Sequence, residues 1–397
     1  MMSAVASSVY VHAPFCARRC FYCDFAVSVR PDASPQPWAE ALGAELKQVE
    51  KDGRLTLADT LDTLYVGGGT PSLLGPDAMR ALADVLTLSR VQSPRLEWTA
   101  EANPESFTPE VAGAWRRAGV NRLSLGTQSF HEHVLRWMGR MHGAEGAERA
   151  VHTARAAGFE DVSVDLIFGL PAVVDRDWSA DLDRAIALDV PHLSLYGLTA
   201  EHATPLGRAV TAGRVEMVED SRYEDEYLEA TTRLTAAGYE HYEVSNFGRP
   251  GHRSRHNQVY WSGAPYLGLG NGAHSYAHPE RRWNIRDWEE YRLAANAGRL
   301  PIAERELLDV AAERLERIWL GLRTAEGLSI TWPETGPAAT LVAGWTSSGL
   351  ASVAGGRVVL TAEGWLVLDR LTVELDDAWP ADATRGSGSE SLDSRRG

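Results

Sequence analysis

HAPFCARRCFYCDF (residues 12–25) holds every cysteine of this 397-residue chain: Cys16, Cys20 and Cys23. It overlaps SSVYVHAPF (7–15), an apolar, β-branched and aromatic run that predicts a strand leading into the cysteine loop. An odd number of cysteines argues against a framework of disulfides. Their placement in one loop indicates a shared role, and clustered thiolates bind metals or iron–sulfur clusters. We therefore expect the chemistry of this protein at the end of the first strand.

Two kinds of metal site fit three neighbouring thiolates. Zinc would need a fourth ligand, which His12 could supply, but zinc sites usually pair two knuckles and no second Cys or His pair with that spacing follows nearby. A 4Fe–4S cluster accepts thiolates, and three of them leave one iron open to a further ligand. Aromatic side chains beside the thiols would screen a cluster from water: Phe15, Phe21, Tyr22 and Phe25. We favour the cluster and keep zinc as the alternative.

Outward from this loop, short apolar runs alternate with helical patterns. The predicted strands are 7–15, 63–69, 96–103, 122–128, 162–170 and 192–198. The helical patterns lie near 36–51, 76–88, 109–118, 144–157 and 176–187. Strands separated by helices of this length are typical of βα units that build a parallel sheet. Six such units predict an α/β fold, a partial (β/α)6 TIM-like barrel.

The rest of the sequence predicts a second, smaller domain. A long helical segment at 219–237 and a seventh possible strand at 242–248 precede a stretch rich in Gly, His and aromatic residues, which we expect to be loop-like. The predicted division is a barrel at 1–248, a loop and connecting segment at 249–300, a small α+β, winged-helix-like C-terminal domain at 301–376 and a tail at 377–397. The tail is polar and has no periodicity, which predicts disorder.

Polar side chains gather where the predicted strands end. GGGTPS (67–72) follows the second strand, and glycine there would let the backbone approach a ligand whose carboxylate the N–H groups bind. Asp165 lies within an apolar strand and needs a hydrogen-bonding partner if it is buried. Other strand ends carry Glu101, Asn103, Gln128, Tyr196 and Thr199. Because these ends meet at one face of a parallel barrel, we expect a binding site there.

The charge balance disfavours one class of partner. With 54 acidic against 39 basic residues the net charge is −15, which argues against binding nucleic acid. One locally basic stretch, RPGHRSRHN (249–257), is either a small basic pocket or a solvated loop. The first residues lack the basic segment and apolar core of a signal peptide, and no run reaches the roughly 18 apolar residues of a membrane span. We predict a cytoplasmic protein.

Together these motifs resemble a known superfamily. Cys-x3-Cys-x2-Cys after a first strand, with GGGTP after the second, is similar to the radical S-adenosylmethionine (radical SAM) superfamily. The resemblance narrows to its HemN/HemW group on YVHAPFCARRCFYCDF, YVGGGTPSLL, EANPES, LSLGTQSF, DLIFGLP and GLRTAEGL. That group contains oxygen-independent coproporphyrinogen III oxidases and their heme-chaperone relatives. The resemblance runs from about residue 8 to 375 and implies a 4Fe–4S cluster whose open iron binds S-adenosylmethionine (SAM).

The resemblance also implies roles for single residues. Cys16, Cys20 and Cys23 would be the cluster ligands. The implied SAM contacts are Tyr10, Tyr22, Gly68, Gly69, Thr70, Glu101, Gln128, Arg140 and Asp165. The glycines and the threonine would meet the methionine end, and some of the polar residues serve a second SAM in the oxidase. One bound SAM or two are both compatible with this sequence.

Two departures favour the heme-chaperone branch over the oxidase. The oxidase pattern has a fourth cysteine two positions after the third, where this chain has Phe25. HNQVYW (256–261) resembles a His-Asn-x-x-Tyr-Trp signature of the chaperones, and imidazole and aromatic rings suit heme. The candidate heme residues are His256, Asn257, Tyr260 and Trp261, with His252 and His274 close in sequence. The competing interpretation is a histidine that packs or hydrogen-bonds in a lid.

The predicted function is a heme chaperone with a 4Fe–4S cluster and an exchangeable SAM. It would carry one heme per chain as cargo and pass it to an unidentified acceptor protein, which could be membrane-bound and contacted peripherally. The alternatives are a coproporphyrinogen III oxidase, a radical SAM methyltransferase and a zinc-stabilised binding protein. The sequence leaves open whether the chain is an enzyme.

Overall fold

The computed structural model describes residues 4–380. The predicted disordered tail, 377–397, lies outside the described residues from residue 381 onward. The chain forms two compact units that divide after Leu307. The predicted boundary at residue 301 differs from this division because the strand that follows it pairs within the first unit.

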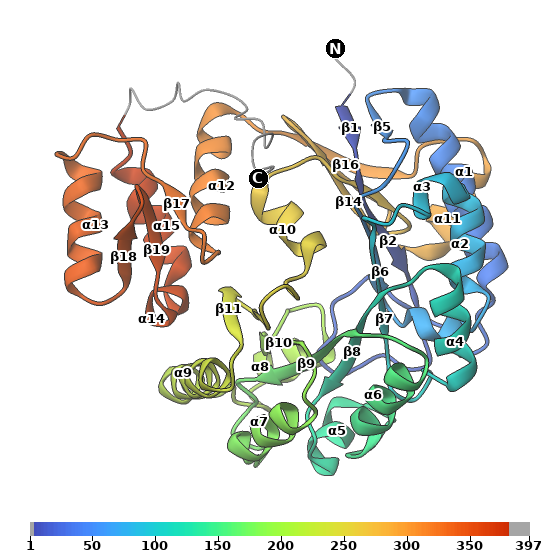
Figure 1. The fold of residues 1–397 in the computed structure, drawn as a ribbon, viewed down its shortest axis with the longest axis horizontal. Helices are drawn as coiled ribbons and strands as arrows, with labels where there is room; N and C mark the ends of the chain where they lie inside the picture. Colours follow the sequence, from blue (N-terminus) through green and yellow to red (C-terminus); the bar gives the residue numbers. More distant parts are fainter. Residues whose placement is uncertain (1–3, 381–397) are drawn as a thin grey trace. The chain divides into compact units, whose positions relative to one another are not determined.

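Six parallel strands form the centre of the first unit (Figure 1). They are β2 (Ser8–Ala13), β6 (Thr63–Gly68), β7 (Glu97–Ala102), β8 (Arg122–Gln128), β9 (Asp161–Phe168) and β10 (His192–Gly197). Each pairs in parallel with the next in chain order, which is what successive right-handed βα units produce. The sheet is open at both edges, so the predicted partial (β/α)6 barrel is confirmed.

Helices separate these strands and lie along the outer side of the curved sheet (Figure 1). They are α1 (Pro35–Asp52), α2 (Ala78–Leu86), α3 (Leu88–Val91), α4 (Pro109–Ala118), α5 (Glu132–Met138), α6 (Gly146–Ala156) and α7 (Trp178–Ala187), whereas α8 (Pro205–Thr211) and α9 (Asp220–Ala236) follow β10. Helix α1 shows the local signals that begin and end a helix. Ser34 accepts a hydrogen bond from the Gln36 N–H at its N-terminus, and Gly53 ends the helix with a left-handed φ of 71°. Short elements complete the connections: β1 (Ala4–Ala6), β3 (Phe15–Cys16), β4 (Ser28–Val29), β5 (Leu55–Leu57) and the 3₁₀ turn η1 (Pro71–Leu74).

The segment after α9 is more ordered than predicted. The seventh strand, expected at 242–248, is a hairpin of β11 (Glu240–Glu243) and β12 (Asn246–Gly248), and β12 pairs antiparallel with β10. The loop and connecting segment expected at 249–300 contains a helix, α10 (Arg255–Ser262), and β13 (Leu267–Leu269), which joins the sheet in parallel with β2. Further on lie β14 (His274–Ala277), β15 (Glu280–Asn284), α11 (Trp288–Asn296) and β16 (Ile302–Leu307).

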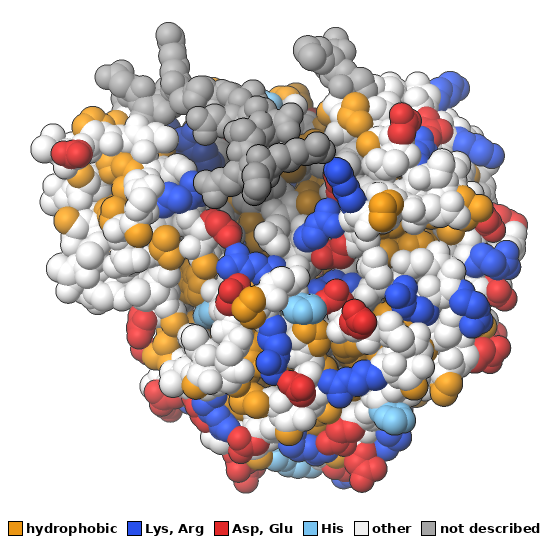
Figure 2. Space-filling model, in the orientation of Figure 1, with side chains coloured by type: hydrophobic (Ala, Val, Ile, Leu, Met, Phe, Trp, Pro, Cys, Tyr) orange, Lys and Arg blue, Asp and Glu red, His pale blue; other side chains and the backbone are white. Residues whose placement is uncertain are grey.

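The basic stretch at 249–257 does not form a basic pocket. Arg249 pairs with Asp189 at 2.6 Å, and Arg253 pairs with Glu240 at 3.0 Å. Figure 2 shows basic and acidic side chains interspersed over one face of the molecule. Among the helices of residues 4–380, none combines the length and the apolar character required to cross a membrane.

The unit that begins at Leu308 is an α+β domain, as predicted. Its helices are α12 (Val310–Leu322), α13 (Pro337–Ser347), α14 (Ala362–Leu366) and α15 (Leu368–Asp377). Its antiparallel sheet has the order β17 (Leu328–Ser329), β19 (Arg357–Leu360), β18 (Ala351–Ala354). Gly355 and Gly356 join the last two strands with φ of 56° and 74°, the values that a tight type I′ hairpin turn requires. Ile318, Val358 and Leu371 are fully buried in its core.

Candidate functional site

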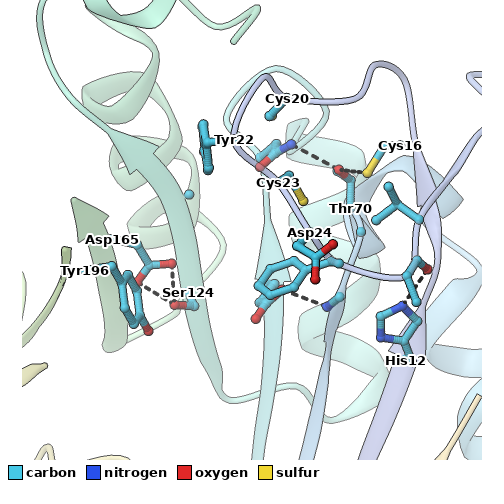
Figure 3. Close-up of a pocket in the computed structure, with 18 of the residues that line it drawn as sticks. His12, Cys16, Cys20, Tyr22, Cys23, Asp24, Thr70, Ser124, Asp165 and Tyr196 are labelled. Atoms are coloured by element: carbon cyan, nitrogen blue, oxygen red, sulfur yellow. Dashed lines mark hydrogen bonds between the residues drawn. The ribbon is translucent and has the colours of Figure 1, made fainter. Parts of the chain in front are cut away.

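A cavity of about 770 Å³ opens where the parallel strands end, as the strand-end residues predicted. All three cysteines and all nine predicted SAM contacts line it: Cys16, Cys20, Cys23, Tyr10, Tyr22, Gly68, Gly69, Thr70, Glu101, Gln128, Arg140 and Asp165. Figure 3 shows the cysteine loop on one side of this cavity and Asp165 with Ser124 and Tyr196 across from it. Of the four heme candidates, Tyr260 is among the lining residues, and His256, Asn257 and Trp261 are not.

The cysteine loop is fixed to the barrel at its middle. The Phe21 N–H donates to the Met138 carbonyl at the end of α5 (3.3 Å), and the Phe21 carbonyl accepts from the Leu206 N–H of α8 (3.0 Å). The Phe21 ring meets Trp137 edge-on at 5.4 Å and packs on a buried apolar cluster that includes Met138 and Leu206. This residue therefore anchors the loop while the thiols on either side face the cavity.

A chain of hydrogen bonds connects the thiols to the ends of β7 and β8. Arg140 donates to the Asn103 side-chain carbonyl (2.6 Å), and Asn103 donates in turn to the Thr70 hydroxyl (3.1 Å). Thr70 donates to the Cys16 sulfur at 3.6 Å, and Arg140 also lies 3.9 Å from the Cys20 sulfur. Hydrogen bonds and positive charge of this kind stabilise thiolates that bind metal.

The donor set is compatible with an iron–sulfur cluster. The three thiols are free, and burial raises the pKa of the Cys16 thiol to about 11, so a thiolate there needs a metal's charge beside it. Within residues 4–380, no group of three or more His, Cys, Asp or Glu side chains is arranged to hold one metal ion. A cluster binds each thiolate at a different iron, so its ligands stand further apart than those of a single ion.

His12 does not serve as a fourth metal ligand in this arrangement. One ring nitrogen is 3.0 Å from the Tyr10 hydroxyl, and the other is 3.0 Å from the Ala26 carbonyl. The nitrogen facing the carbonyl must carry the proton, which leaves the other to accept from the tyrosine. Burial lowers the pKa of His12 to about 4, so the ring is neutral. A zinc site at the three cysteines would therefore lack His12, the fourth ligand that the sequence suggested.

The glycines of GGGTP are required by protein contacts. A Cβ on Gly68, whose φ is 110°, would lie 2.3 Å from the His12 ring, and a Cβ on Gly69 would lie 2.8 Å from the Phe15 carbonyl. The Gly68 N–H donates to the Glu101 carboxylate at 3.0 Å. The backbone donor expected to bind a ligand carboxylate is thus occupied by a carboxylate of the chain.

Two carboxyl groups face the cavity with raised pKa values. Burial, and then the charge of Asp165, raise the pKa of Glu101 to about 7, although Tyr65 and Gly68 donate hydrogen bonds to it. Burial raises the pKa of Asp165 to about 6 against the hydrogen bonds it accepts from Ser124 (2.9 and 3.0 Å). Asp165 therefore has the polar partner that its position in an apolar strand demanded. Such perturbed carboxyls in a cleft are typical of functional sites.

Gln128 has an unusual backbone conformation at the end of β8. Its φ is +70°, which is strained for a residue other than glycine, and a register shift between Gly126 and Gln128 interrupts the pairing with β9. The bulge turns the side chain into the cavity, and its Oε1 is buried without a hydrogen-bond partner among the described residues. Strain and an unpaired polar atom together indicate a residue held for a ligand.

The aromatic side chains beside the thiols do not together shield the cysteine loop from water. Phe15 packs edge-on against Trp288 at 5.0 Å, and Tyr22 lines the cavity. Phe25, in contrast, is 62% exposed at the cavity rim, so the expectation that it shields a cluster from water is wrong. An exposed phenyl ring at a rim is apolar surface available to a ligand.

The HNQVYW motif lies on α10, whose first turn is capped by Ser254. His256 is 1% exposed, and its ring nitrogens are each 2.8 Å from a hydroxyl, of Thr63 and of Tyr260. Its ring also stacks on Tyr65 at 5.2 Å. Because both nitrogens are engaged and buried, His256 is not placed to bind the iron of a heme. The competing interpretation, a packed and hydrogen-bonded histidine, agrees with this geometry.

Sequence reasoning missed part of the cavity wall. Tyr266, Gly272 and Arg286 line the cavity from the segment predicted to be a connection, and His274, noted for its nearness in sequence, lines it too. Two signals for order in this region were present: the helix-capping Ser254 before HNQVYW, and the short apolar run of β13. Neither indicates that the segment returns to the first strand.

Comparisons with known proteins agree with this geometry. The family model described as "Radical SAM superfamily" matches residues 10–185. A Mycobacterium tuberculosis protein named "Heme chaperone HemW" is 39% identical over 367 residues, covering 91% of this chain and 92% of that protein. The Escherichia coli protein of the same name is 36% identical over 268 residues, 67% of this chain and 69% of that protein. The solved structure of coproporphyrinogen III oxidase (HemN) from Escherichia coli has a TM-score of 0.77 at 21% identity, covering 94% of this chain and 90% of that one. The likeness to the oxidase is one of fold.

Proposed function

Since this chain belongs to the HemW family of radical SAM proteins, we propose that it is a heme chaperone, which binds one heme and passes it to an acceptor protein. The observation that carries the proposal is 39% identity to a protein named "Heme chaperone HemW" over nine tenths of both chains. Phe25, in place of the oxidase's fourth cysteine, supports it. The oxidase likeness does not compete, because it rests on 21% identity.

Cys16, Cys20 and Cys23 would hold a 4Fe–4S cluster at the cavity, with SAM bound exchangeably beside it. When bound, these two groups supply one-electron chemistry. Arg140, through Asn103, would orient the cysteine loop and offset thiolate charge. The strained Gln128 would offer its unpartnered carbonyl oxygen to a donor of a bound SAM.

The partner and the location follow as proposals. The heme is cargo, so an acceptor protein must receive it; its identity and any attachment to a membrane are predictions that the sequence alone motivates. Three free thiols fit a reducing compartment such as the cytoplasm.

The test is an anaerobic titration of the cluster-reconstituted full chain with hemin, followed by the Soret absorption band. We expect saturation near one heme per chain. The same preparation is incubated with coproporphyrinogen III, SAM and a reductant, and we expect no decarboxylated product. Turnover of coproporphyrinogen III, or the lack of saturable hemin binding, would each overturn the proposal.

A further inference from the structure

The histidines of the first unit differ sharply in what their ring nitrogens do. Two of them line the cavity in the described part of the chain, His12 and His274. Both nitrogens of His12 are hydrogen-bonded, as are both nitrogens of the buried His256. His274 is exposed, and its ring makes no hydrogen bond to any residue between 4 and 380. An imidazole that is to bind iron must keep one nitrogen free.

The fold holds this ring in a fixed orientation. His274 begins β14 and is paired in register with Trp283 of β15, and the two rings stack at 5.5 Å and 20°. Its neighbour Ser275 points the opposite way and accepts a hydrogen bond from the Gly268 N–H at 3.0 Å. Because successive side chains alternate across a strand, burial of Ser275 turns His274 outward to the rim.

A buried acid fastens the base of this hairpin. Glu45 of α1 accepts hydrogen bonds from the Gly270 N–H at 2.9 Å and from the Asn284 side chain at 2.5 Å. Tyr291 donates a third, at 2.5 Å. The base of the hairpin that carries His274 and Trp283 is therefore anchored to α1, and rigid support of this kind is what a metal-binding ring needs.

The rim around His274 suits a flat, apolar ligand. Asn271 donates to the Ala26 carbonyl at 3.0 Å, which places the loop before His274 against the segment that carries the exposed Phe25. On the cavity wall, Tyr260 meets Tyr266 edge-on at 4.7 Å. A porphyrin bound here would cover aromatic surface that otherwise faces water.

One guanidinium at the rim is placed to meet a carboxylate of a heme. Arg286 lines the cavity with 61% of its side chain exposed; it donates to the Asp24 carbonyl at 2.6 Å and lies 3.6 Å from the Asp24 carboxylate, with which a heme carboxylate would share it. Guanidinium groups bind carboxylates with good geometry. Partial desolvation of the ring at the rim, together with the charges of Arg281 and Arg286, lowers the pKa of His274, so at neutral pH the ring is in the uncharged form that binds metal.

We propose that His274, and not a residue of the HNQVYW motif, is the ligand through which this chain binds the heme iron. The proposal rests on the proposed heme-chaperone function and names the group that performs it. Within that function the motif has a different role, because His256 holds Tyr260 at the cavity wall by a hydrogen bond of 2.8 Å.

The experiment compares three alanine variants of the full, cluster-reconstituted chain, titrated anaerobically with hemin. His274→Ala removes the proposed ligand, and His256→Ala removes the motif histidine. His152→Ala removes an exposed histidine on α6, outside the cavity, as the matched control. Each titration is followed by the Soret band and by electron paramagnetic resonance of the ferric heme, and is repeated with added imidazole.

For His274→Ala we expect a changed ferric-heme spectrum and an affinity for hemin weakened about tenfold or more. Added imidazole should restore the wild-type spectrum in this variant, because it fills the vacated ligand position. His152→Ala, and His256→Ala wherever circular dichroism shows it folded, should keep the wild-type spectrum. An unchanged spectrum in His274→Ala would overturn the assignment while leaving heme binding intact. A wild-type chain that does not saturate with hemin would overturn the chaperone function and the assignment together.

Discussion

The cysteine loop and helix α10 were both singled out by sequence motifs, yet the structure uses them in opposite ways. Cys16, Cys20 and Cys23 are free thiols on the cavity wall. His256 of α10 is buried with both ring nitrogens hydrogen-bonded. A motif shows that residue types matter at given positions, but it does not separate a ligand from a packing residue. Burial and the hydrogen bonds of each polar atom make that distinction.

The largest effect is expected for a substitution in the cysteine loop. In Cys20→Ser a hydroxyl replaces a thiolate, so the cluster loses one of three ligands, and we expect bound iron to fall more than about tenfold. Iron and acid-labile sulfide are measured after anaerobic reconstitution, with circular dichroism confirming that the half-buried position tolerates the change. A variant that retains a full complement of iron would show that this thiol is not a ligand.

The same comparison predicts that His256 of the HNQVYW motif contributes to the stability of the fold rather than to heme binding. His256→Ala removes a buried ring and its hydrogen bonds to Thr63 and Tyr260, at 2.8 Å each. We expect a loss of about 3 kcal/mol in the free energy of unfolding, measured by urea denaturation of the apoprotein. The exposed His152→Ala should change it by less than about 0.5 kcal/mol. A loss below about 1 kcal/mol in His256→Ala would show that the residue is not a structural support.

Much of the site could be predicted because βα units impose their own geometry. Once 63–69 and 96–103 are parallel neighbours, Gly68 and Glu101 must lie together at one edge, and the structure joins them by a hydrogen bond of 3.0 Å. The same rule brings Asp165 to the cavity. These contacts are set by the period of the strand and the order of the strands, and both can be read from local sequence.

The remaining wall depends on long-range pairing, which local sequence does not encode. β13 returns to β2 across more than 250 residues, pairing Leu267 with Val9, and brings His274 to the rim. Three residues of strand are too short for a periodicity signal. Gln128 was assigned by resemblance, but its left-handed φ and the bulge beside it follow from tertiary packing.

Within the cavity, the raised pKa of Glu101 predicts a pH dependence. In the folded state the pKa of Glu101 is about 7, whereas its ordinary value is 4.5. The contribution of this carboxyl group to the free energy of unfolding is therefore fully present below pH 4.5 and is lost as the pH rises through 7. Because the carboxyl group borders an open cavity and is partly screened by solvent, we expect its contribution to the free energy of unfolding to fall by about 1–2 kcal/mol between pH 5 and pH 8.

Glu101→Gln should flatten that part of the stability curve, measured by urea denaturation of the apoprotein at several pH values. Asp165→Asn is the matched comparison, with its effect centred near pH 6. If Glu101→Gln and the wild type have parallel pH profiles, the carboxyl is ionised in the folded apoprotein, and the cavity is better hydrated than its burial implies.

The smallest effect, and the one that tests the link between the two regions, belongs to Tyr260. Its hydroxyl bonds the buried His256 while its ring reaches the cavity wall and meets Tyr266 at 4.7 Å. Tyr260→Phe keeps the ring and removes the hydroxyl, so we expect about 1 kcal/mol less stability. In a double-mutant cycle with His256→Ala most of that difference should vanish, because both changes remove the same hydrogen bond. Hemin affinity should stay within about twofold of wild type, since the phenyl ring keeps its apolar contact. A cycle with no coupling would show that the Tyr260 hydroxyl does not act through His256. A hemin affinity that falls on loss of the hydroxyl alone would show that the hydroxyl, and not only the ring, contacts the ligand.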